Sequence, residues 1–146
     1  MPQPDDAYSA MLALSMQLAA KEAAEQRLST DERIIADIVW IDVQVAPNGF
    51  DGWLCYTSNE AIQRTLHALD TVGCSRVAVL VKNALAVAGI DPANMSDDAR
   101  EAQLQSLREA HRSRLHQPDN EFYDEVEDCM ERCRAFVSAR RRSFPI

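Results

Sequence analysis

Residues 119–137 place apolar and acidic side chains on opposite sides of one helix, and this pattern constrains the fold more than any other feature of the chain. At about 100° per residue, the apolar side chains fall within one arc. They are Phe122, Val126, Cys129, Met130, Cys133, Phe136 and Val137. The opposite arc holds Glu121, Asp124, Glu125, Asp128 and Glu131, with Glu127 at its edge. The pattern predicts a helix that buries its apolar side and displays its carboxylates outward.

The charge density of this helix has two interpretations. Seven acidic residues between Asp119 and Glu131 span roughly 18 Å of helix, about one charge per 2.6 Å. Duplex DNA carries about one charge per 1.7 Å, so a second acidic helix beside this one would imitate a phosphate rail. The alternative is a solvated face whose acids favour the helix N-terminus. The sequence alone leaves both interpretations open.

The rest of the chain consists of further helix patterns separated by turn residues. Strong helix formers without Gly or Pro fill residues 6–28, where apolar side chains on more than one face indicate either a deep position or cover by a second subunit. Ser29, Thr30 and Asp31 supply an N-cap for residues 31–46. Residues 38–45 fit helical spacing but also alternate as a strand would. Because no partner strand of similar quality is present, we expect a helix there.

The second half of the chain carries equally clear start and stop signals. Ser58 begins a helix that ends at Gly73, and Gly89 ends the segment 75–88, whose apolar residues on nearly all sides predict a central buried helix. Ser96 caps the next helix, which we expect Pro118 to terminate, and Asp119 or Asn120 caps the last one. The sequence therefore predicts an all-α, compact single-domain bundle of about six to seven helices over residues 1–146, with loose ends at 1–5 and 140–146.

Residues 46–60 interrupt the helical pattern with turn residues and large apolar ones. Pro47, Asn48, Gly49 and Gly52 favour a turn, and the apolar residues are Phe50, Trp53, Leu54 and Tyr56. We expect a turn that tucks its aromatic side chains inward. Aromatic and polar groups together can also line a pocket, so an unrecognised enzyme site near residues 48–56 is one functional hypothesis.

Charge excludes some partners. The formal charge of −8 disfavours direct nucleic-acid binding and an anionic membrane surface, because both need a basic footprint. No run reaches the ~18 apolar residues of a membrane span. The acidic start of the chain is unlike a secretory signal, so we expect a cytoplasmic protein.

Catalytic and metal motifs are weak. Cys129 and Cys133 lie one helical turn apart, but no second pair at zinc-finger spacing follows, so we expect the four cysteines to be core thiols. None of His67, His111 and His116 has a nucleophile or an HExxH pattern at suitable spacing. We therefore predict no catalytic residues, no cofactor and no metal.

Three segments resemble the DNA mimic protein 19 family over about residues 31–137: VWIDVQVAPNGFDGWLCYTSNE, TLHALDTVGCSRVAVLVKNAL and DNEFYDEVEDCMERCRAFV. Asn48, Gly49 and Phe50 match the end of the family's turn motif, and Trp53 and Tyr56 occupy its aromatic positions. The helix-pair motif is matched by Ala68, Leu69, Gly73 and Ala84, and the final acidic phrase by Phe122, Tyr123, Glu125 and Asp128. Pro47 stands where the family usually has Asn, and Asn48 where it has the first Gly.

The resemblance implies an all-helical, acidic and dimeric protein whose family includes a mimic of duplex DNA that occupies the DNA-binding surface of a transcription regulator. Our leading hypothesis is a non-enzymatic acidic regulator that binds a basic DNA-binding protein. Its contact residues would be Glu121, Asp124, Glu125, Glu127, Asp128 and Glu131. The alternative is an immunity or antitoxin-like protein that inhibits a basic nuclease through the same face.

Overall fold

The structure is a computed structural model that describes residues 6–144, and for residues 111 and 112 it describes only the backbone. The helices are α1 (Ala7–Ala23), α2 (Thr30–Cys55), α3 (Asn59–Val72), α4 (Ser75–Ala88), α5 (Asp97–His111), η1 (Arg112–Leu115), α6 (His116–Ala139) and η2 (Arg141–Ser143), where η marks a short 3-10 helix. No strand is present between residues 6 and 144. The predicted all-α fold is confirmed, and residues 38–45 are helical.

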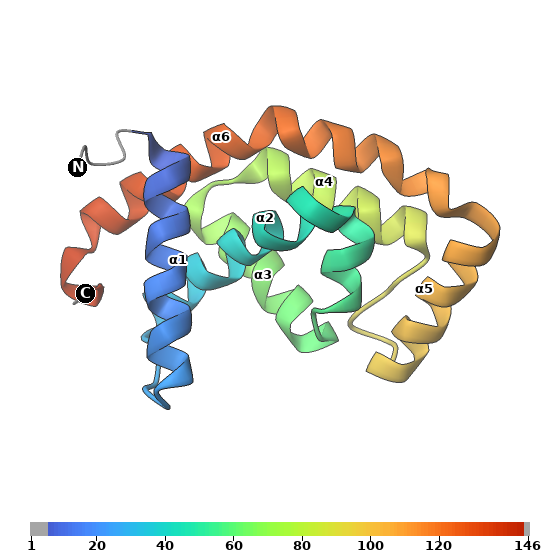
Figure 1. The fold of residues 1–146 in the computed structure, drawn as a ribbon, viewed down its shortest axis with the longest axis horizontal. Coiled ribbons are helices and arrows are strands. Elements are labelled where there is room, and N and C mark those ends of the chain that lie inside the picture. The colour runs from blue at the N-terminus through green and yellow to red at the C-terminus, as the bar shows by residue number, and fades with distance from the viewer. Residues whose placement is uncertain (1–5, 145–146) are drawn as a thin grey trace.

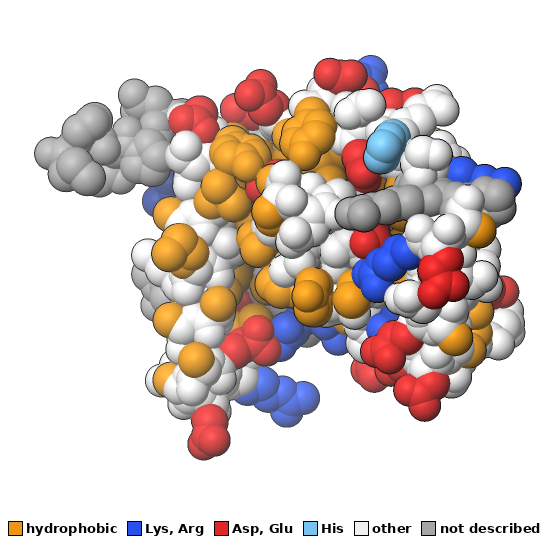
Figure 2. Space-filling model, turned by 45° about the vertical axis from the view of Figure 1, so that its right-hand side comes forward, with side chains coloured by type: hydrophobic (Ala, Val, Ile, Leu, Met, Phe, Trp, Pro, Cys, Tyr) orange, Lys and Arg blue, Asp and Glu red, His pale blue; other side chains and the backbone are white. Residues whose placement is uncertain are grey.

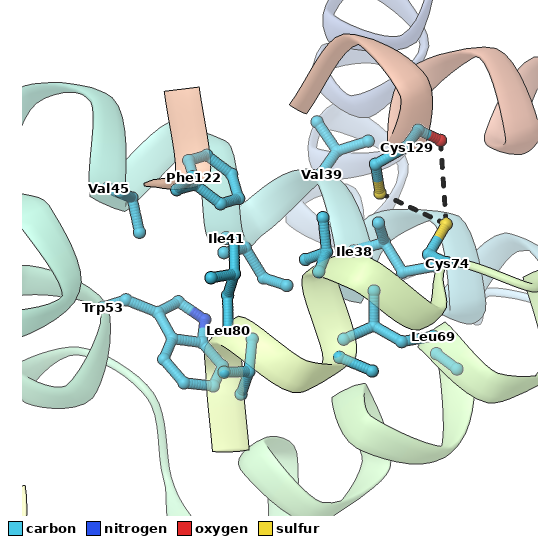
Figure 3. Close-up of a cluster of buried hydrophobic side chains, with 14 of the residues drawn as sticks. Ile38, Val39, Ile41, Val45, Trp53, Leu69, Cys74, Leu80, Phe122 and Cys129 are labelled. Carbon is cyan, nitrogen blue, oxygen red and sulfur yellow. Dashed lines mark hydrogen bonds between the residues drawn. The ribbon is translucent and has the colours of Figure 1, made fainter. Parts of the chain in front are cut away.

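The long helix α6 runs across the top of the molecule in Figure 1 and packs against α1, α2 and α4. Its apolar side is buried as predicted, with Phe122, Met130 and Cys133 at most 2% exposed. Side chains from α2 and α4 fill the core beside it, among them Ile41, Trp53 and Leu80 (Figure 3). The amphipathic pattern therefore predicts correctly which side of α6 faces inward.

Local capping chemistry sets the predicted starts of α2, α3 and α5. Ser29 Oγ accepts a hydrogen bond from the Glu32 amide, and the Glu32 carboxylate accepts one from the Ser29 amide, so a complete capping box begins α2. Ser58 and Ser96 cap α3 and α5 through the amides of Ala61 and Ala99. Helix α1 is shorter than expected, because the chain leaves the helix after Ala23 and Glu25 adopts a left-handed conformation with φ 60°.

The expectation of a turn over residues 46–60 was wrong, because α2 includes residues 46–55. The helix continues past Pro47 to Cys55, with one non-helical residue, Gly49, at φ 69° and ψ −176°. This single residue bends the chain, and the helix then resumes. The bend turns Phe50 and Trp53 into the core, where both are fully buried, whereas Tyr56 stays 68% exposed. The predicted inward position of the aromatic side chains is thus confirmed for Phe50 and Trp53 and wrong for Tyr56.

Three further expectations were wrong. Helix α4 is not buried all round, because Val79 is 55% and Val87 36% exposed. Pro118 does not terminate a helix but lies in the first turn of α6, where its missing N–H has no helical acceptor to lose. Neither Asp119 nor Asn120 caps α6, whose N-cap residue is Leu115.

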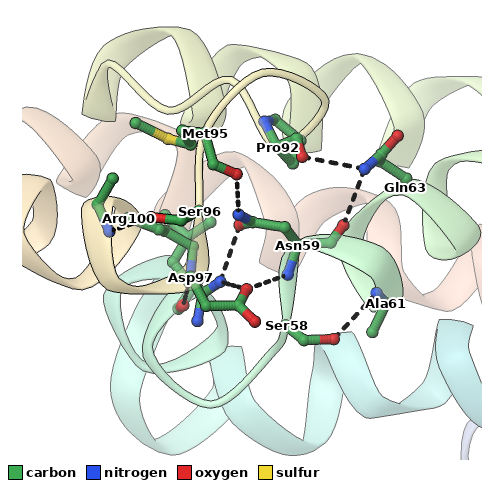
Figure 4. A network of polar contacts seen from close by, with 11 residues as sticks. Ser58, Asn59, Ala61, Gln63, Pro92, Met95, Ser96, Asp97 and Arg100 are labelled. Carbon is green, nitrogen blue, oxygen red and sulfur yellow. Dashed lines mark hydrogen bonds and ion pairs between the residues drawn. The ribbon is translucent and has the colours of Figure 1, made fainter.

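A buried arginine joins α5 to the end of α2 and the start of α3. Arg100 is 3% exposed and donates hydrogen bonds to the Leu54 carbonyl and to Asn59 Oδ1, at 3.0 and 2.8 Å. It also pairs with Asp97, which in turn accepts from the Asn59 amide (Figure 4). Because the Arg100 guanidinium has both a carboxylate and hydrogen-bond acceptors as partners, it can be buried without an unpaired ion, while the Asp97 side chain stays exposed.

Of the ends expected to be loose, residues 1–5 and 145–146 lie outside the described residues. Residues Arg141–Ser143 form η2, and Phe144 beyond it is 8% exposed. The Arg140 guanidinium lies 3.9 Å from the centre of the Phe136 ring. Over residues 6–144, no helix combines the length and apolarity that crossing a bilayer needs.

The close contact at Gly49 gives a stability prediction. A Cβ atom there would lie 2.6 Å from Asp119 Oδ2, whereas at Gly73, which also has positive φ, the nearest atom is 3.9 Å away. We expect Gly73→Ala to lower the free energy of unfolding by ~1–2 kcal/mol through backbone strain alone. Gly49→Ala should cost ~2–4 kcal/mol, because its φ 69°, ψ −176° conformation is essentially restricted to Gly and because Asp119 must also move. Urea denaturation measures both, and equal losses would show that the contact with Asp119 is unimportant.

Candidate functional site

The six predicted contact residues lie along one outward stretch of α6. Asp124, Glu127, Asp128 and Glu131 are exposed, and Glu121 and Glu125 are half-buried. Acidic side chains are visible along the upper edge of the molecule in Figure 2, where α6 runs in Figure 1. The structure therefore brings these carboxylates together on one helix surface, which we call the acidic face.

Arginines neutralise only part of the acidic face. Arg132 pairs with Asp128 at 2.9 Å, and Arg76 approaches Glu125 at 3.5 Å. Gln117 donates a neutral hydrogen bond to Glu121. Among the described residues, no ion pair joins Lys or Arg to Glu121, Asp124, Glu127 or Glu131. Within the described part of the chain, these four carboxylates therefore lack a cationic partner.

A second acidic helix does not flank α6. Its neighbour α4 contains no acidic residue, and its neighbour α1 contains only Glu22, which pairs with Arg33. The buried acids of α2, Glu32, Asp37 and Asp42, have partners within the protein. The acidic face is thus one row of charge along α6, and the two-helix arrangement considered from the sequence is wrong for α1 and α4.

A shallow groove of about 400 Å³ lies between α4 and α6. Arg76, Val79 and Leu80 of α4 line it together with Glu121, Asp124 and Glu125 of the acidic face. Exposed Val87 lies two helical turns further along α4. The groove adds an apolar strip to the row of carboxylates, and the sequence missed it because α4 reads as apolar on nearly every side.

The turn-motif residues do not meet in one pocket. Phe50 packs edge-to-face on both Trp53 and Phe122, with ring centres 6.2 and 5.8 Å apart, so these rings are core side chains. Asn48 and Gly49 line a separate hollow of about 430 Å³ beside His116 and Asp119. Tyr56 lines a different groove. The motif therefore serves the bend in α2, and its residues do not converge on a common ligand position.

Asp119 anchors the bend. Its Oδ1 accepts a hydrogen bond of 2.7 Å from the Phe50 amide, which the bend frees from the helical pattern. Burial raises the pKa of the Asp119 carboxyl, and the hydrogen bond from Phe50 opposes the rise. Nearby Asp51 pairs with Arg108 at 2.9 Å. Tyr56 does not join Asp51 and a histidine in this hollow, so nothing in its geometry adds to the enzyme hypothesis.

An apolar groove of about 570 Å³ lies between α1 on one side and α2 and α3 on the other. Exposed Met16, Trp40, Val43 and Tyr56 line it, and the ion pairs Arg33–Glu22 and Arg64–Asp37 border it. Figure 2 shows hydrophobic side chains around this hollow, beside α1 on the left. We call it the apolar groove.

Comparison with known proteins identifies the family. Residues 26–140 match the family described as DMP19-like protein. The chain belongs to the DMP19-like protein family. The match covers helices α2 to α6, including the bend and the whole acidic face, and leaves α1 outside. No curated protein and no solved structure gives a significant match to the chain. The suspected resemblance is confirmed at the level of the DMP19-like family.

The anchoring role of Asp119 gives a pH-dependent prediction. Asp119→Ala leaves the Phe50 amide without its acceptor and should lower the free energy of unfolding by ~1–3 kcal/mol. Asp119→Asn keeps an oxygen acceptor. Because the pKa of Asp119 is raised in the folded protein, wild-type stability falls as pH rises through that pKa, and the Asn variant lacks this loss.

We therefore expect Asp119→Asn to be at least as stable as wild type at about pH 7 and to lose this advantage near pH 3.5, below the ordinary pKa of Asp. Urea denaturation at both pH values measures the difference. If the Asn variant were as unstable as the Ala variant at neutral pH, the negative charge rather than the acceptor oxygen would hold the bend.

Proposed function

We propose that this DMP19-like protein is a non-enzymatic acidic regulator that binds the basic DNA-binding surface of another protein, such as a transcription regulator, in the cytoplasm. The observation that carries the proposal is the row of outward carboxylates on α6, four of which have no ion pair among the described residues. Membership of the DMP19-like family, together with the resemblance to the DNA mimic protein 19 family noted in the sequence, supports the same direction.

Charge favours such a complex before contact is made. A formal charge of −8 attracts a basic protein over distances of about a Debye length and raises the association rate. A surface that binds DNA already presents Lys and Arg at a spacing suited to phosphates. Carboxylates one helical turn apart along α6 offer these cations repeated acceptors.

The groove between α4 and α6 supplies contacts that charge alone does not. Val79 is 55% exposed beside Glu121 and Asp124. An apolar side chain next to the acidic face would bury against the partner and slow dissociation, because electrostatics acts mainly on the association rate. We therefore place the partner across α6 and the exposed side of α4.

Neutralising the unpaired carboxylates tests the proposal. The variant Glu121→Gln, Asp124→Asn, Glu127→Gln, Glu131→Gln should capture the basic partner from native lysate at least tenfold less tightly, equivalent to ~1.4 kcal/mol. Excess duplex DNA should also release the partner from the wild-type protein, because DNA and the acidic face compete for one surface. The difference in capture between wild type and variant, and the release of the partner by DNA, should both become smaller as the salt concentration is raised.

The matched control is Glu25→Gln, Asp70→Asn, Glu101→Gln, Glu109→Gln, which removes the same number of charges from exposed acids outside α6. It should bind like the wild type. Equal losses in the two variants would mean that total charge, rather than the acidic face, drives binding. A partner that DNA cannot release would exclude DNA mimicry, and a captured nuclease would favour the immunity-like alternative.

We also propose that the protein is a homodimer joined through the apolar groove. Two copies of net charge −8 repel each other, which disfavours contact through the acidic face. The apolar groove instead has paired charges at its border and exposes Met16 and Tyr56 by 73% and 68%. A second copy would remove this apolar surface from water.

Sedimentation equilibrium tests the dimer. The wild type should have twice the chain mass of 16.3 kDa, and Met16→Glu with Tyr56→Glu should give a monomer, because burying two carboxylates opposes association. The control Val79→Glu with Val87→Glu adds the same charge on α4 and should remain dimeric. Loss of the dimer only in the control would place the interface on α4, and a monomeric wild type would refute the dimer.

A further inference from the structure

Three cysteines from distant parts of the chain meet in the core. Cys74 immediately precedes α4, and Cys129 and Cys133 lie one turn apart on α6. The three Sγ atoms all lie within 4.8 Å of one another, and those of Cys74 and Cys129 are 3.2 Å apart (Figure 3). The residues are 2%, 3% and 0% exposed. The sequence revealed only the pair on α6, because Cys74 is 55 residues from Cys129.

Hydrogen bonds link the cysteines of this cluster, and a cation lies beside it. The Cys129 thiol donates to Cys74 Sγ, and the Cys74 thiol donates to the Cys129 carbonyl. Arg132 Nη1 lies 3.9 Å from the position that a Cβ on Gly73 would occupy, beside the cluster. Since the thiolate is the form of cysteine that binds metals, the three thiols would lose protons when a metal ion binds.

The ligand set selects a class of metal ion. An all-sulfur site favours soft ions such as Cu(I) and Zn²⁺. Thiolates bound to one metal at about 2.3 Å in a tetrahedral arrangement lie roughly 3.8 Å apart, a separation within the range of these Sγ atoms. Closed zinc sites use four protein ligands, and the cluster of described residues has three. Cu(I) is stable with three thiolates and needs no water as a fourth ligand.

We propose that Cys74, Cys129 and Cys133 form a buried three-thiolate site for a soft metal ion, and that the site takes Cu(I) in preference to Zn²⁺. Each thiol that becomes a ligand releases its proton, so affinity falls as the solution is acidified. The bound ion would tie the start of α4 to the middle of α6. Asp128 and Glu131 occupy the outer side of the same turns of α6, so metal binding would also fix the position of the acidic face.

An anaerobic titration of the reduced full chain with Cu(I), in competition with the chelator bicinchoninate, tests the site. We expect one equivalent to bind. Cys74→Ser, Cys129→Ser and Cys133→Ser should each weaken binding by at least ~100-fold, because losing a direct ligand should cost at least as much as the 10–100-fold loss of an outer-shell partner. Cys55→Ser is the matched control, because Cys55 is a partly buried cysteine outside the cluster. It should bind Cu(I) like the wild type.

Two measurements on the wild-type protein keep the test independent of variant folding. X-ray absorption should show sulfur ligands only, three per Cu(I), and one equivalent of Cu(I) should raise Tm by ~5 °C or more. Failure to bind one equivalent, an equal loss in Cys55→Ser, or nitrogen and oxygen ligands would overturn the proposal. Displacement of Cu(I) by an equal concentration of Zn²⁺ would overturn the stated preference.

Discussion

The hydrogen bond from the Phe50 amide to Asp119 joins the bend of α2 to the first turn of α6, and the arrangement of the core depends on it. The bend turns Phe50 and Trp53 inward, and Phe50 then packs against Phe122 of α6. Gly49 is needed at this point because its conformation has positive φ and because the Asp119 carboxylate occupies the space of a side chain. Asp119 therefore has a structural role, which the exposed acidic residues after it in α6 do not share.

The acidic face exists because burial on one side of α6 outweighs repulsion on the other. Like charges one turn apart cost a few tenths of a kcal/mol per pair, whereas each large apolar side chain buried from water contributes ~1.5–3 kcal/mol. Phe122, Met130, Cys133 and Phe136 are all buried in the core. The helix can therefore carry an unfavourable set of charges outward without external help, and a basic partner would relieve the remaining repulsion.

Most helix starts and ends set by neighbouring residues were predictable from the sequence, although the start of α6 and the end of α1 were not, and features that depend on distant contacts were missed. The caps at Ser29, Ser58 and Ser96 and the ends at Gly73 and Gly89 follow from local hydrogen bonding and backbone freedom. The continuation of α2 beyond Pro47 was missed, because its bend is completed by a residue 69 positions away. The same limit hid the meeting of Cys74 with Cys129. The acidic residues of α6 were located correctly because their spacing alone defines their side of the helix, while their part in binding remains a proposal.

Helix α1 lies outside the residues that match the DMP19-like family, yet it packs against both α2 and α6. Leu18 is fully buried, Met11 is 4% exposed, and the Tyr8 hydroxyl donates a 2.7 Å hydrogen bond to buried Asp42. A shorter chain starting at residue 26 would uncover the apolar surface beneath these side chains and leave the Asp42 carboxylate without its donor. The family match therefore stops short of a helix whose side chains complete the core beneath α2 and α6.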